Sequence, residues 1–264
     1  GDVLLPAGRR LGMREITMAA AMGHATVPVR RRPRIAILAT GDELVAPGSA
    51  PGPDQIVASN GYGLAALVRS AGGAPHDLGI VRDDTAAIGA AVGQALALPA
   101  EILVTLGGAS VGDHDLVQAA LTSQGMALDF WKIAMRPGKP LVFGRLARPD
   151  GSAMAVLGLP GNPVSSLVCG ILFVRPLIAA LLGEMPGDPT EAAVLGADMS
   201  ANDGRQDYVR ATLSASAGLP VATSFSTQDS SMLSVLVRAD CLIVRPPHAP
   251  AAKAGEPCRI VRLP

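Results

Sequence analysis

Aromatic residues are scarce in this chain of 264 residues, since Phe, Trp and Tyr together make up 3% of it. Few side chains are therefore available on which the bases of a single-stranded nucleic acid could stack. An excess of one charge is also missing, because 22 Lys and Arg residues balance 22 Asp and Glu residues. No overall field steers such a chain to a polyanion or an anionic membrane, so we expect no nucleic-acid partner and any anion site to be local.

Cysteine and histidine are sparse as well. Cys169, Cys241 and Cys258 are odd in number and lie in apolar sequence, which is typical of reduced structural thiols. The four histidines do not pair with one another or with a cysteine at the spacing of metal ligands. We therefore expect neither a disulfide nor a zinc site.

Long apolar runs are the third absence. No stretch reaches the ~18 apolar residues that a membrane-spanning helix needs, and the first residues do not resemble a signal peptide. We therefore expect a cytoplasmic protein without a membrane partner.

What is present indicates a folded protein with an aliphatic core, because apolar residues make up 49% of the chain. Residues 1–32 begin with a strand-like stretch at 2–5. A helical pattern follows at 13–22, where Gly23 would end the helix, and a basic run stands at 30–32. We interpret this segment as the remnant of an N-terminal domain followed by a linker.

Residues 33–187 alternate between strand and helix patterns. The strand patterns are continuous aliphatic runs, which are typical of a parallel sheet that is covered on both faces. We predict an α/β domain with a doubly wound, mostly parallel sheet. Its expected strands are 35–39, 77–81, 102–106 and 130–134, then a hairpin of 141–144 and 153–158, and its expected helices are 60–71, 85–98, 115–123 and 164–182.

Residues 188–264 have a different pattern, in which short alternating stretches are separated by Gly, Pro, Asn and Asp. Such a pattern predicts a small all-β domain of the barrel type. The expected strands are 193–195, 208–213, 219–223, 241–244 and 259–263.

The stretch ILVTLGGASVGDHDLV, residues 102–117, combines a buried strand, a glycine-rich turn and the start of a helix. Backbone N–H groups that such a turn leaves unpaired attract anions, and glycine lets an oxyanion approach the backbone closely. Phosphate is therefore the first ligand to consider. The alternative is an ordinary turn in which Ser110 and either Asp113 or Asp115 only cap the helix.

Charged residues and glycines follow each predicted strand of the α/β domain. Ligands of doubly wound domains bind outside the carboxyl ends of the strands, so these turns are expected to meet. Each turn alone has an ordinary explanation as a helix cap or a tight bend, but together they favour one shared site. The turns carry Thr40, Gly41, Asp42 and Glu43; Asp83 and Asp84; Gly107, Gly108, Ser110, Gly112, Asp113 and Asp115; Arg136, Gly138 and Lys139; and Pro160, Gly161, Asn162 and Pro163.

Several of these segments occur together in one known family. They are RPRIAILATGDELV, the pair Asp83 and Asp84, TLGGASVGDHD, FWKIAMRPGKP, GLPGNPVSS followed by FVRP, and a C-terminal QDSS. In this combination the chain resembles the molybdopterin molybdenumtransferases, the family of bacterial MoeA and of the E domain of gephyrin, over essentially its whole length. The GGxSxGxxD part alone is shared with the molybdopterin adenylyltransferases, whereas the other segments are specific to the transferases.

The resemblance implies a transferase of molybdenum cofactor biosynthesis. Its reaction inserts molybdate into adenylylated molybdopterin, releases AMP and requires a divalent cation, which we take as Mg²⁺. By motif, Glu43, Asp83 and Asp115 are the catalytic carboxylates, and Asp83 and Asp115 bind the metal. The substrate-binding residues implied by the motifs are Thr40, Gly41, Asp42, Gly107, Gly108, Ser110, Gly112 and Asp113; Lys132, Arg136 and Lys139 for phosphate; and Pro160, Gly161, Asn162, Pro163, Arg210 and Ser230 around the molybdate.

Two positions depart from the family pattern. Asp229 replaces a glycine that usually stands before the residue matching Ser230, and it adds negative charge beside the expected oxyanion site. Arg136 stands where lysine is frequent, which keeps the charge but changes the hydrogen-bond geometry.

The resemblance also implies a homodimer, with a contact to the molybdopterin adenylyltransferase. In the family, a region that would precede Gly1 completes the site across the dimer. We therefore expect this chain to bind ligand but to turn over weakly or not at all.

Two other functions remain open from the sequence. A molybdopterin adenylyltransferase would share the glycine turn, although the C-terminal β domain argues against it. A non-catalytic scaffold that binds a partner peptide would not need the carboxylates at the strand ends.

Overall fold

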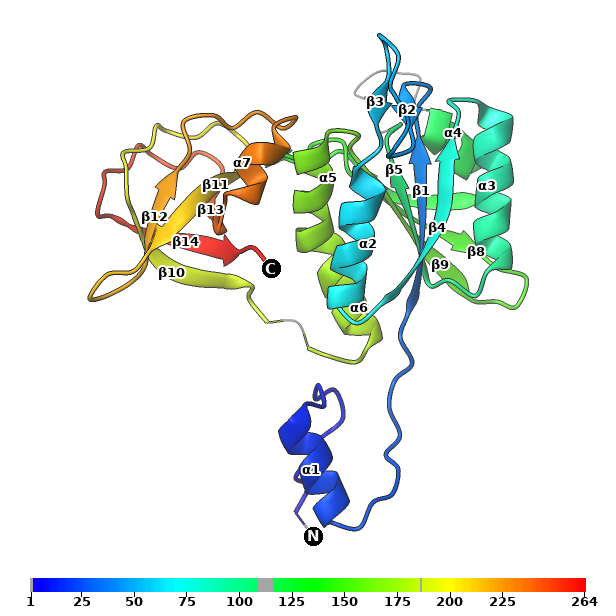
Figure 1. Cartoon of the computed structure of the whole chain (residues 1–264), viewed down its shortest axis with the longest axis horizontal. Helices are drawn as coiled ribbons and strands as arrows, with labels where there is room; N and C mark the ends of the chain where they lie inside the picture. The colour runs from blue at the N-terminus through cyan, green and yellow to red at the C-terminus, as the bar shows by residue number, and fades with distance from the viewer. Residues whose placement is uncertain (1, 109–115, 186) are drawn as a thin grey trace.

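A computed structural model describes residues 2–108, 116–185 and 187–264. The chain forms an N-terminal segment, an α/β domain and a β-barrel (Figure 1). In this view the barrel lies on the left and the α/β domain on the right. An extended linker without regular secondary structure leads up from the N-terminal helix into the central sheet.

A six-stranded sheet with the order β4-β1-β5-β9-β8-β6 forms the centre of the α/β domain. The first four strands are parallel, and β8 is antiparallel to both of its neighbours. The predicted doubly wound, mostly parallel sheet with a final β8–β9 hairpin is therefore confirmed. The strands are β1 (Arg34–Thr40), β4 (Ala74–Val81), β5 (Ile102–Leu106), β6 (Met126–Trp131), β8 (Val142–Ala147) and β9 (Ala153–Leu159).

Both faces of this sheet are buried, because successive strand residues point to opposite sides. Ile35 and Ile37 belong to a core under helices α2 (Asn60–Ser70), α5 (Pro163–Cys169) and α6 (Arg175–Leu181). Ala36 and Leu38 belong to a second core under α3 (Thr85–Ala97) and α4 (Leu116–Ser123). Continuous apolar strands are the sequence signature of this two-sided burial.

Helices α5 and α6 are joined by a π-helical turn, Gly170–Val174, into one apolar helix. This helix, Pro163–Leu181, has 19 residues and a mean hydropathy of 2.1, which is long and apolar enough to cross a membrane. The expectation that no stretch reaches that length was therefore wrong, because a single Arg175 interrupts the run without ending the helix. Val164, Val168, Val174 and Ile178 are buried inside the protein, so the helix is also part of its core.

The C-terminal domain is a closed five-stranded barrel, as its pattern of short strands predicts. Its strands follow the order β12-β10-β14-β13-β11, and a further pairing of β12 with β11 closes the ring. The strands are β10 (Thr190–Leu195), β11 (Gln206–Ser214), β12 (Val221–Ser224), β13 (Cys241–Arg245) and β14 (Pro257–Arg262), and α7 (Leu233–Val237) precedes β13.

The barrel and the α/β domain are joined by an apolar contact and by a short strand. Val164 and Val168 of α5 share a buried cluster with Leu242 and Val261 of the barrel. In addition, β7 (Met135–Arg136) leaves the α/β domain and pairs with β11 at the edge of the barrel sheet. A short pair, β2 (Leu44–Val45) and β3 (Ile56–Val57), forms an arm at the top of Figure 1.

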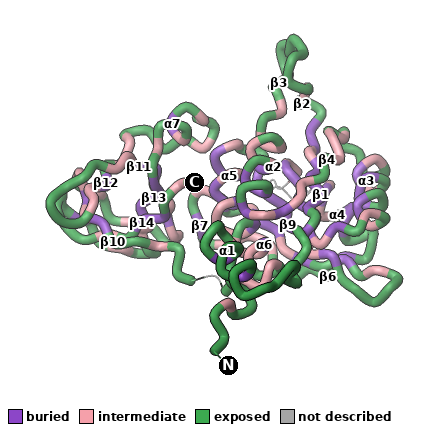
Figure 2. The backbone as a smooth tube through the Cα atoms, turned by 60° about the horizontal axis from the view of Figure 1, so that its bottom comes forward, coloured by how far each residue is buried: buried purple, intermediate pink, exposed green. Residues whose placement is uncertain are grey.

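The N-terminal segment is exposed over most of its length (Figure 2). Its helix α1 (Met13–Ala21) ends as predicted, with Gly23 at a φ of 83°. No strand forms at residues 2–5, so that prediction was wrong: the stretch pairs with no described strand. The segment contacts the α/β domain through Arg10, whose Nε lies 3.2 Å from the Glu184 carboxylate.

Candidate functional site

The ends of the parallel strands form one row at the edge of the α/β sheet. Thr40 pairs with Val81, and Ala39 pairs with Leu106 in the register of the sheet. Leu106 in turn pairs with Leu159 of β9. The turns that follow β4, β1, β5 and β9 therefore leave the sheet side by side, as expected for a doubly wound domain.

The glycines after β5 are required by close packing. Gly107 has a φ of 96°, and a Cβ there would lie 2.4 Å from the carbonyl oxygen of Thr40. Gly108 has a φ of 67°, and its Cβ would lie 2.1 Å from Val117 Cγ2. The Thr40 hydroxyl is buried beside this turn and has no hydrogen-bond partner among the described residues, which end at Gly108 and resume at Leu116. Glycine thus lets the backbone of the turn pack closely against the end of β1 and against Val117 of α4.

Three carboxylates lie together at the ends of β1 and β4. A Cβ on Gly41 would lie 2.7 Å from Glu43 Oε2, so the Glu43 carboxylate covers this glycine. Burial raises the pKa of Asp83, and the negative charges of Glu43 and Asp42 raise it further, while the Asp42 N–H donates to Asp83 and acts the other way. Mutual repulsion of this kind is relieved by a cation.

Asp84, next to Asp83, and Asp42 each have a further local contact. Asp84 caps α3, because its carboxylate accepts a hydrogen bond of 2.8 Å from the Ala87 N–H, as the cap interpretation of this pair predicts. Asp42 forms an exposed ion pair of 3.3 Å with Arg82. Asp42 and Glu43 also line an open depression together with residues 52–55 of the arm.

The turn of residues 160–163 connects this edge to the barrel. A Cβ on Gly161 would lie 3.6 Å from the Gly107 Cα, so the turn packs against the glycine turn. Asn162 Nδ2 donates to Ser230 Oγ at 3.0 Å, and the Val164 N–H donates to the Ser230 carbonyl at 3.1 Å. Ser230 of the barrel therefore reaches the α/β edge, which unites two segments 68 residues apart.

Arg210 supports the loop that carries Ser230. Its guanidinium is buried and donates through Nη1 to the Asp229 carbonyl at 2.9 Å and through Nε to Gln228 Oε1 at 3.2 Å. The Asp229 carboxylate accepts from the N–H and hydroxyl of Ser231, and these bonds lower its pKa. The departure at this position is thus accommodated by a local turn, with Arg210 as a nearby positive charge.

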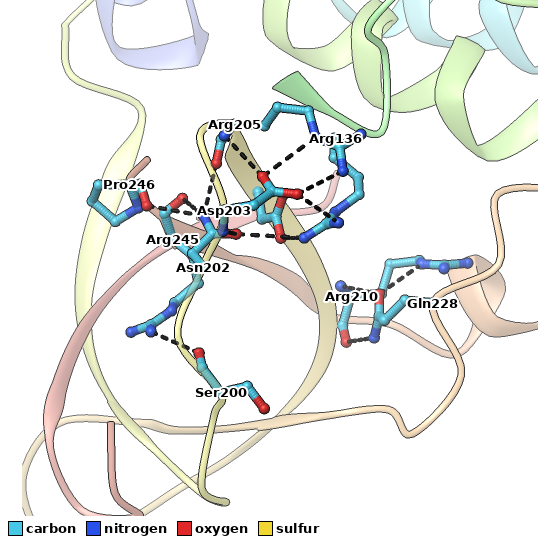
Figure 3. A network of polar contacts seen from close by, with 10 residues as sticks. Arg136, Ser200, Asn202, Asp203, Arg205, Arg210, Gln228, Arg245 and Pro246 are labelled. Carbon is cyan, nitrogen blue, oxygen red and sulfur yellow. Dashed lines mark hydrogen bonds and ion pairs between the residues drawn. The ribbon is translucent and has the colours of Figure 1, made fainter. Parts of the chain in front are cut away.

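The three cations implied for phosphate have different partners in the structure, and their phosphate role stays a prediction. Lys132 Nζ lies 3.7 Å from the centre of the Trp131 ring, at the end of β6. Lys139 is exposed, and its carbonyl accepts from the Ile133 N–H at 2.9 Å. Arg136 instead turns to the barrel, where it pairs with Asp207 and with Asp203 (Figure 3).

Asp207 explains why Arg136 is held there. The two residues are opposite each other in the β7–β11 pairing, and the Asp207 side chain is 11% exposed. Its Oδ1 atom is buried and has no hydrogen-bond partner among the described residues. The Arg136 guanidinium, bonded to Oδ2, therefore supplies the main compensation of its charge, with Arg205 as a second nearby positive charge. Asn202, drawn beside them in Figure 3, accepts from Arg136 at 3.4 Å and donates to the Arg205, Arg245 and Pro246 carbonyls.

Four of the implied site residues, Ser110, Gly112, Asp113 and Asp115, lie outside the described residues. Their roles stay predictions. Sequence reasoning also overlooked Asn60, whose Nδ2 donates to the Gly161 carbonyl at 2.7 Å. Its only signal was its place at the start of a predicted helix that begins beside the strand ends.

Within the described residues, no three His, Cys, Asp or Glu side chains are arranged to hold a metal ion. The carboxylates near Asp83 do supply the hard oxygen donors that Mg²⁺ prefers. In phosphate-binding sites Mg²⁺ takes only one or two carboxylates, and phosphate and water supply the other ligands. The described part of the site therefore fits Mg²⁺ only together with a ligand that carries phosphate.

Fold and site together define a two-domain protein, in which a glycine turn and carboxylates at the edge of a doubly wound sheet lie near a loop of a closed barrel. Residues 36–180 match the family described as probable molybdopterin binding domain, and residues 192–263 match the MoeA C-terminal region, domain IV. The chain belongs to the molybdopterin molybdenumtransferase family.

Individual relatives agree with this assignment. The molybdopterin molybdenumtransferase of Nostoc sp. is 39% identical over 100% of this chain and 61% of the relative. That of Haemophilus influenzae is 34% identical over 97% of this chain and 62% of the relative. A crystal structure of the molybdopterin biosynthesis MoeA protein from Pyrococcus horikosii superposes with a TM-score of 0.83 at 27% identity, covering 99% of this chain and 62% of that protein. The chain thus spans about three fifths of the length of these relatives.

Proposed function

We propose that this chain acts in molybdenum cofactor biosynthesis as a molybdopterin molybdenumtransferase. It would bind adenylylated molybdopterin and molybdate, insert the metal at the dithiolene and release AMP. The observation that carries the proposal is the junction at residues 160–163, where the glycine turn of the α/β domain meets Ser230 of the barrel. The relatives named for this activity support the reaction class.

In this proposal the described residues form two halves of one pocket. The turn at Gly107 and Gly108 is proposed to meet the phosphate of the nucleotide, and the buried Thr40 hydroxyl beside it has no hydrogen-bond partner among the described residues. Asn162 and Ser230 border the opposite half, where their amide and hydroxyl groups suit a tetrahedral oxyanion such as molybdate. The turn between them would hold the two reactants next to each other.

The carboxylates Glu43 and Asp83, with Asp115, are the proposed catalytic groups. Mg²⁺ would be held by Asp83 and Asp115 together with the phosphate, and it would neutralise charge on the phosphate. The cluster around Asp83 supports this, since burial and like charges already raise the pKa of that carboxyl. The carboxylates would position the phosphate through the cation they hold, because an ionised carboxylate has no hydrogen to donate to a phosphate oxygen.

The proposed partners follow from the family and not from contacts in the structure. We propose a homodimer, a contact with the molybdopterin adenylyltransferase and a cytoplasmic location, without a nucleic-acid or membrane partner. Turnover by this chain alone is proposed to be weak.

The test is AMP release by the purified chain under single-turnover conditions. Adenylylated molybdopterin with Mg²⁺ should yield AMP when molybdate is added and none in its absence. Asp83→Asn should abolish the release, whereas Asp129→Asn, an exposed carboxylate on β6, serves as the control and should not.

Two results would contradict the proposal. Formation of adenylylated molybdopterin from ATP and molybdopterin, without any molybdate-dependent AMP, would make the chain an adenylyltransferase. Absence of binding to either substrate, with the biological activity of Asp83→Asn and Glu43→Gln intact, would favour a non-catalytic scaffold.

A further inference from the structure

The turn of residues 160–163 is held from three directions. The Ser166 hydroxyl, on α5, donates to the Pro160 carbonyl at 2.6 Å. Asn162 Nδ2 donates to Ser230 Oγ of the barrel at 3.0 Å. The third bond comes from α2, where Asn60 Nδ2 donates to the Gly161 carbonyl at 2.7 Å.

Asn60 is the first residue of α2, and the start of this helix lies against the end of β5. A Cβ on the next residue, Gly61, would lie 3.8 Å from Leu106 Cδ1, so the start of the helix packs on the last residue of that strand. The Ser59 side chain in the preceding cap position makes no capping hydrogen bond. The start of α2 thus packs on the end of β5 through Gly61 and is bonded to the turn after β9 through the Asn60 amide.

Asn162 uses its side chain in an unusual way for its position. It is the residue before helix α5, where an asparagine side chain commonly accepts from the first turn of the helix. Here it makes no such capping bond, and its amide donates across the domain boundary to Ser230. The Val164 N–H also donates to Ser230, so the orientation of the turn determines where Ser230 lies.

We propose that Asn60 is a positioning residue for the molybdate half of the pocket. By holding the Gly161 carbonyl, it sets the direction of the neighbouring Asn162 amide, and Asn162 in turn holds Ser230 against the α/β edge. The inference rests on the proposed function, in which Ser230 borders the molybdate. Asn60 itself touches neither the barrel loop nor, in this account, the reacting atoms.

Asn60→Asp is the most selective variant. It keeps the shape of the side chain but removes the N–H donor, and an acidic residue is favourable in the first turn of a helix, so α2 should fold. Asn60→Ala removes the contact without adding charge and guards against a charge effect of the first variant. Ser59→Ala is the matched control, because Ser59 directly precedes Asn60 and its side chain makes no capping hydrogen bond.

Two measurements test the proposal. In both Asn60 variants the KM for molybdate should rise about tenfold, which corresponds to about 1.4 kcal/mol and to the loss of one hydrogen bond. The Kd for adenylylated molybdopterin should stay at the value of the unaltered chain, and the melting temperature should fall only slightly with the lost hydrogen bond; general destabilisation would not affect one substrate and spare the other. Ser59→Ala should change none of the three: the KM for molybdate, the Kd for adenylylated molybdopterin and the melting temperature.

The second measurement needs no substrate. Hydrogen exchange of the Val164 amide, which donates to Ser230, should be about tenfold faster in both Asn60 variants and unchanged in Ser59→Ala. Exchange at the same rate in all three variants would overturn the positioning role. The two proposals can fail separately. If Val164 exchange is faster in the Asn60 variants but the unaltered chain releases no AMP, the positioning role of Asn60 stands and the proposed function is refuted.

Discussion

Replacing Gly107 by alanine should damage the glycine turn more than its backbone conformation alone explains. At a φ of 96°, an alanine costs ~1–2 kcal/mol because its Cβ is unfavourable in the left-handed region. The Cβ would also lie 2.4 Å from the Thr40 carbonyl oxygen, and backbone cannot rotate away as a side chain can. Overpacking of this kind adds ~1–3 kcal/mol, so we expect a total loss of ~2–5 kcal/mol in unfolding free energy.

Gly125→Ala provides the control for the conformational part. Gly125 has a similar φ of 86°, but nothing lies within 4 Å of its Cβ position. Urea unfolding can be followed by Trp131, the single tryptophan, which lies in the same α/β domain. The explanation would be refuted if Gly125→Ala lost as much stability as Gly107→Ala, because the contact with Thr40 would then contribute nothing.

Three other predictions concern charged groups. Arg136→Gln should lower the unfolding free energy by ~2 kcal/mol, because it removes the main positive partner of the buried Asp207 carboxylate. This value is below the ~3–5 kcal/mol of a fully buried pair, because the arginine is half exposed and solvent screens its charge. The hydrogen bond from Arg9 lowers the pKa of Glu15 to about 2, so the carboxylate should stabilise α1 above pH 4.5 and lose this effect as the pH falls toward 2, which amide exchange in α1 measures. Glu43→Gln should lower the pKa of Asp83 in an NMR titration, since the Glu43 charge contributes to raising it.

Each of these predictions has a result that contradicts it. A double-mutant cycle of Arg136→Gln with Asp207→Asn that shows no coupling would mean that the pair is not an energetic unit. For α1, Glu15→Gln should remove the pH dependence, and an unchanged profile in this variant would assign it to another group. An Asp83 titration that is the same with and without Glu43 would leave burial as the main cause of its raised pKa.

The sequence was most informative where periodicity and glycine act locally. Strands such as β5 were predictable because residues buried on both faces must be apolar throughout. Gly23 could be recognised as the end of α1 because few other residues adopt its φ of 83°. The closed barrel was predictable only as a type, since the β12–β11 pairing depends on contacts between distant segments.

Contacts between segments far apart in the chain were beyond the reach of the sequence. Arg136 looks like a phosphate-binding residue by its place in the motif, but the β7–β11 pairing sets it opposite a buried Asp207. By sequence Asn60 is an ordinary first residue of a helix, and only the fold brings the Gly161 carbonyl within reach of its amide. The same holds for residues 2–5, because a strand exists only if another strand is available to pair with it.

The most direct test of the central claim is a crystal structure of the chain soaked with molybdate and AMP, measured near the molybdenum absorption edge. We predict one anomalous peak beside the contact of the 160–163 turn with Ser230, with the AMP phosphate at Gly107 and Gly108. A molybdenum peak remote from both the turn and Ser230 would contradict the account, because the junction of the two domains would then not be the oxyanion site.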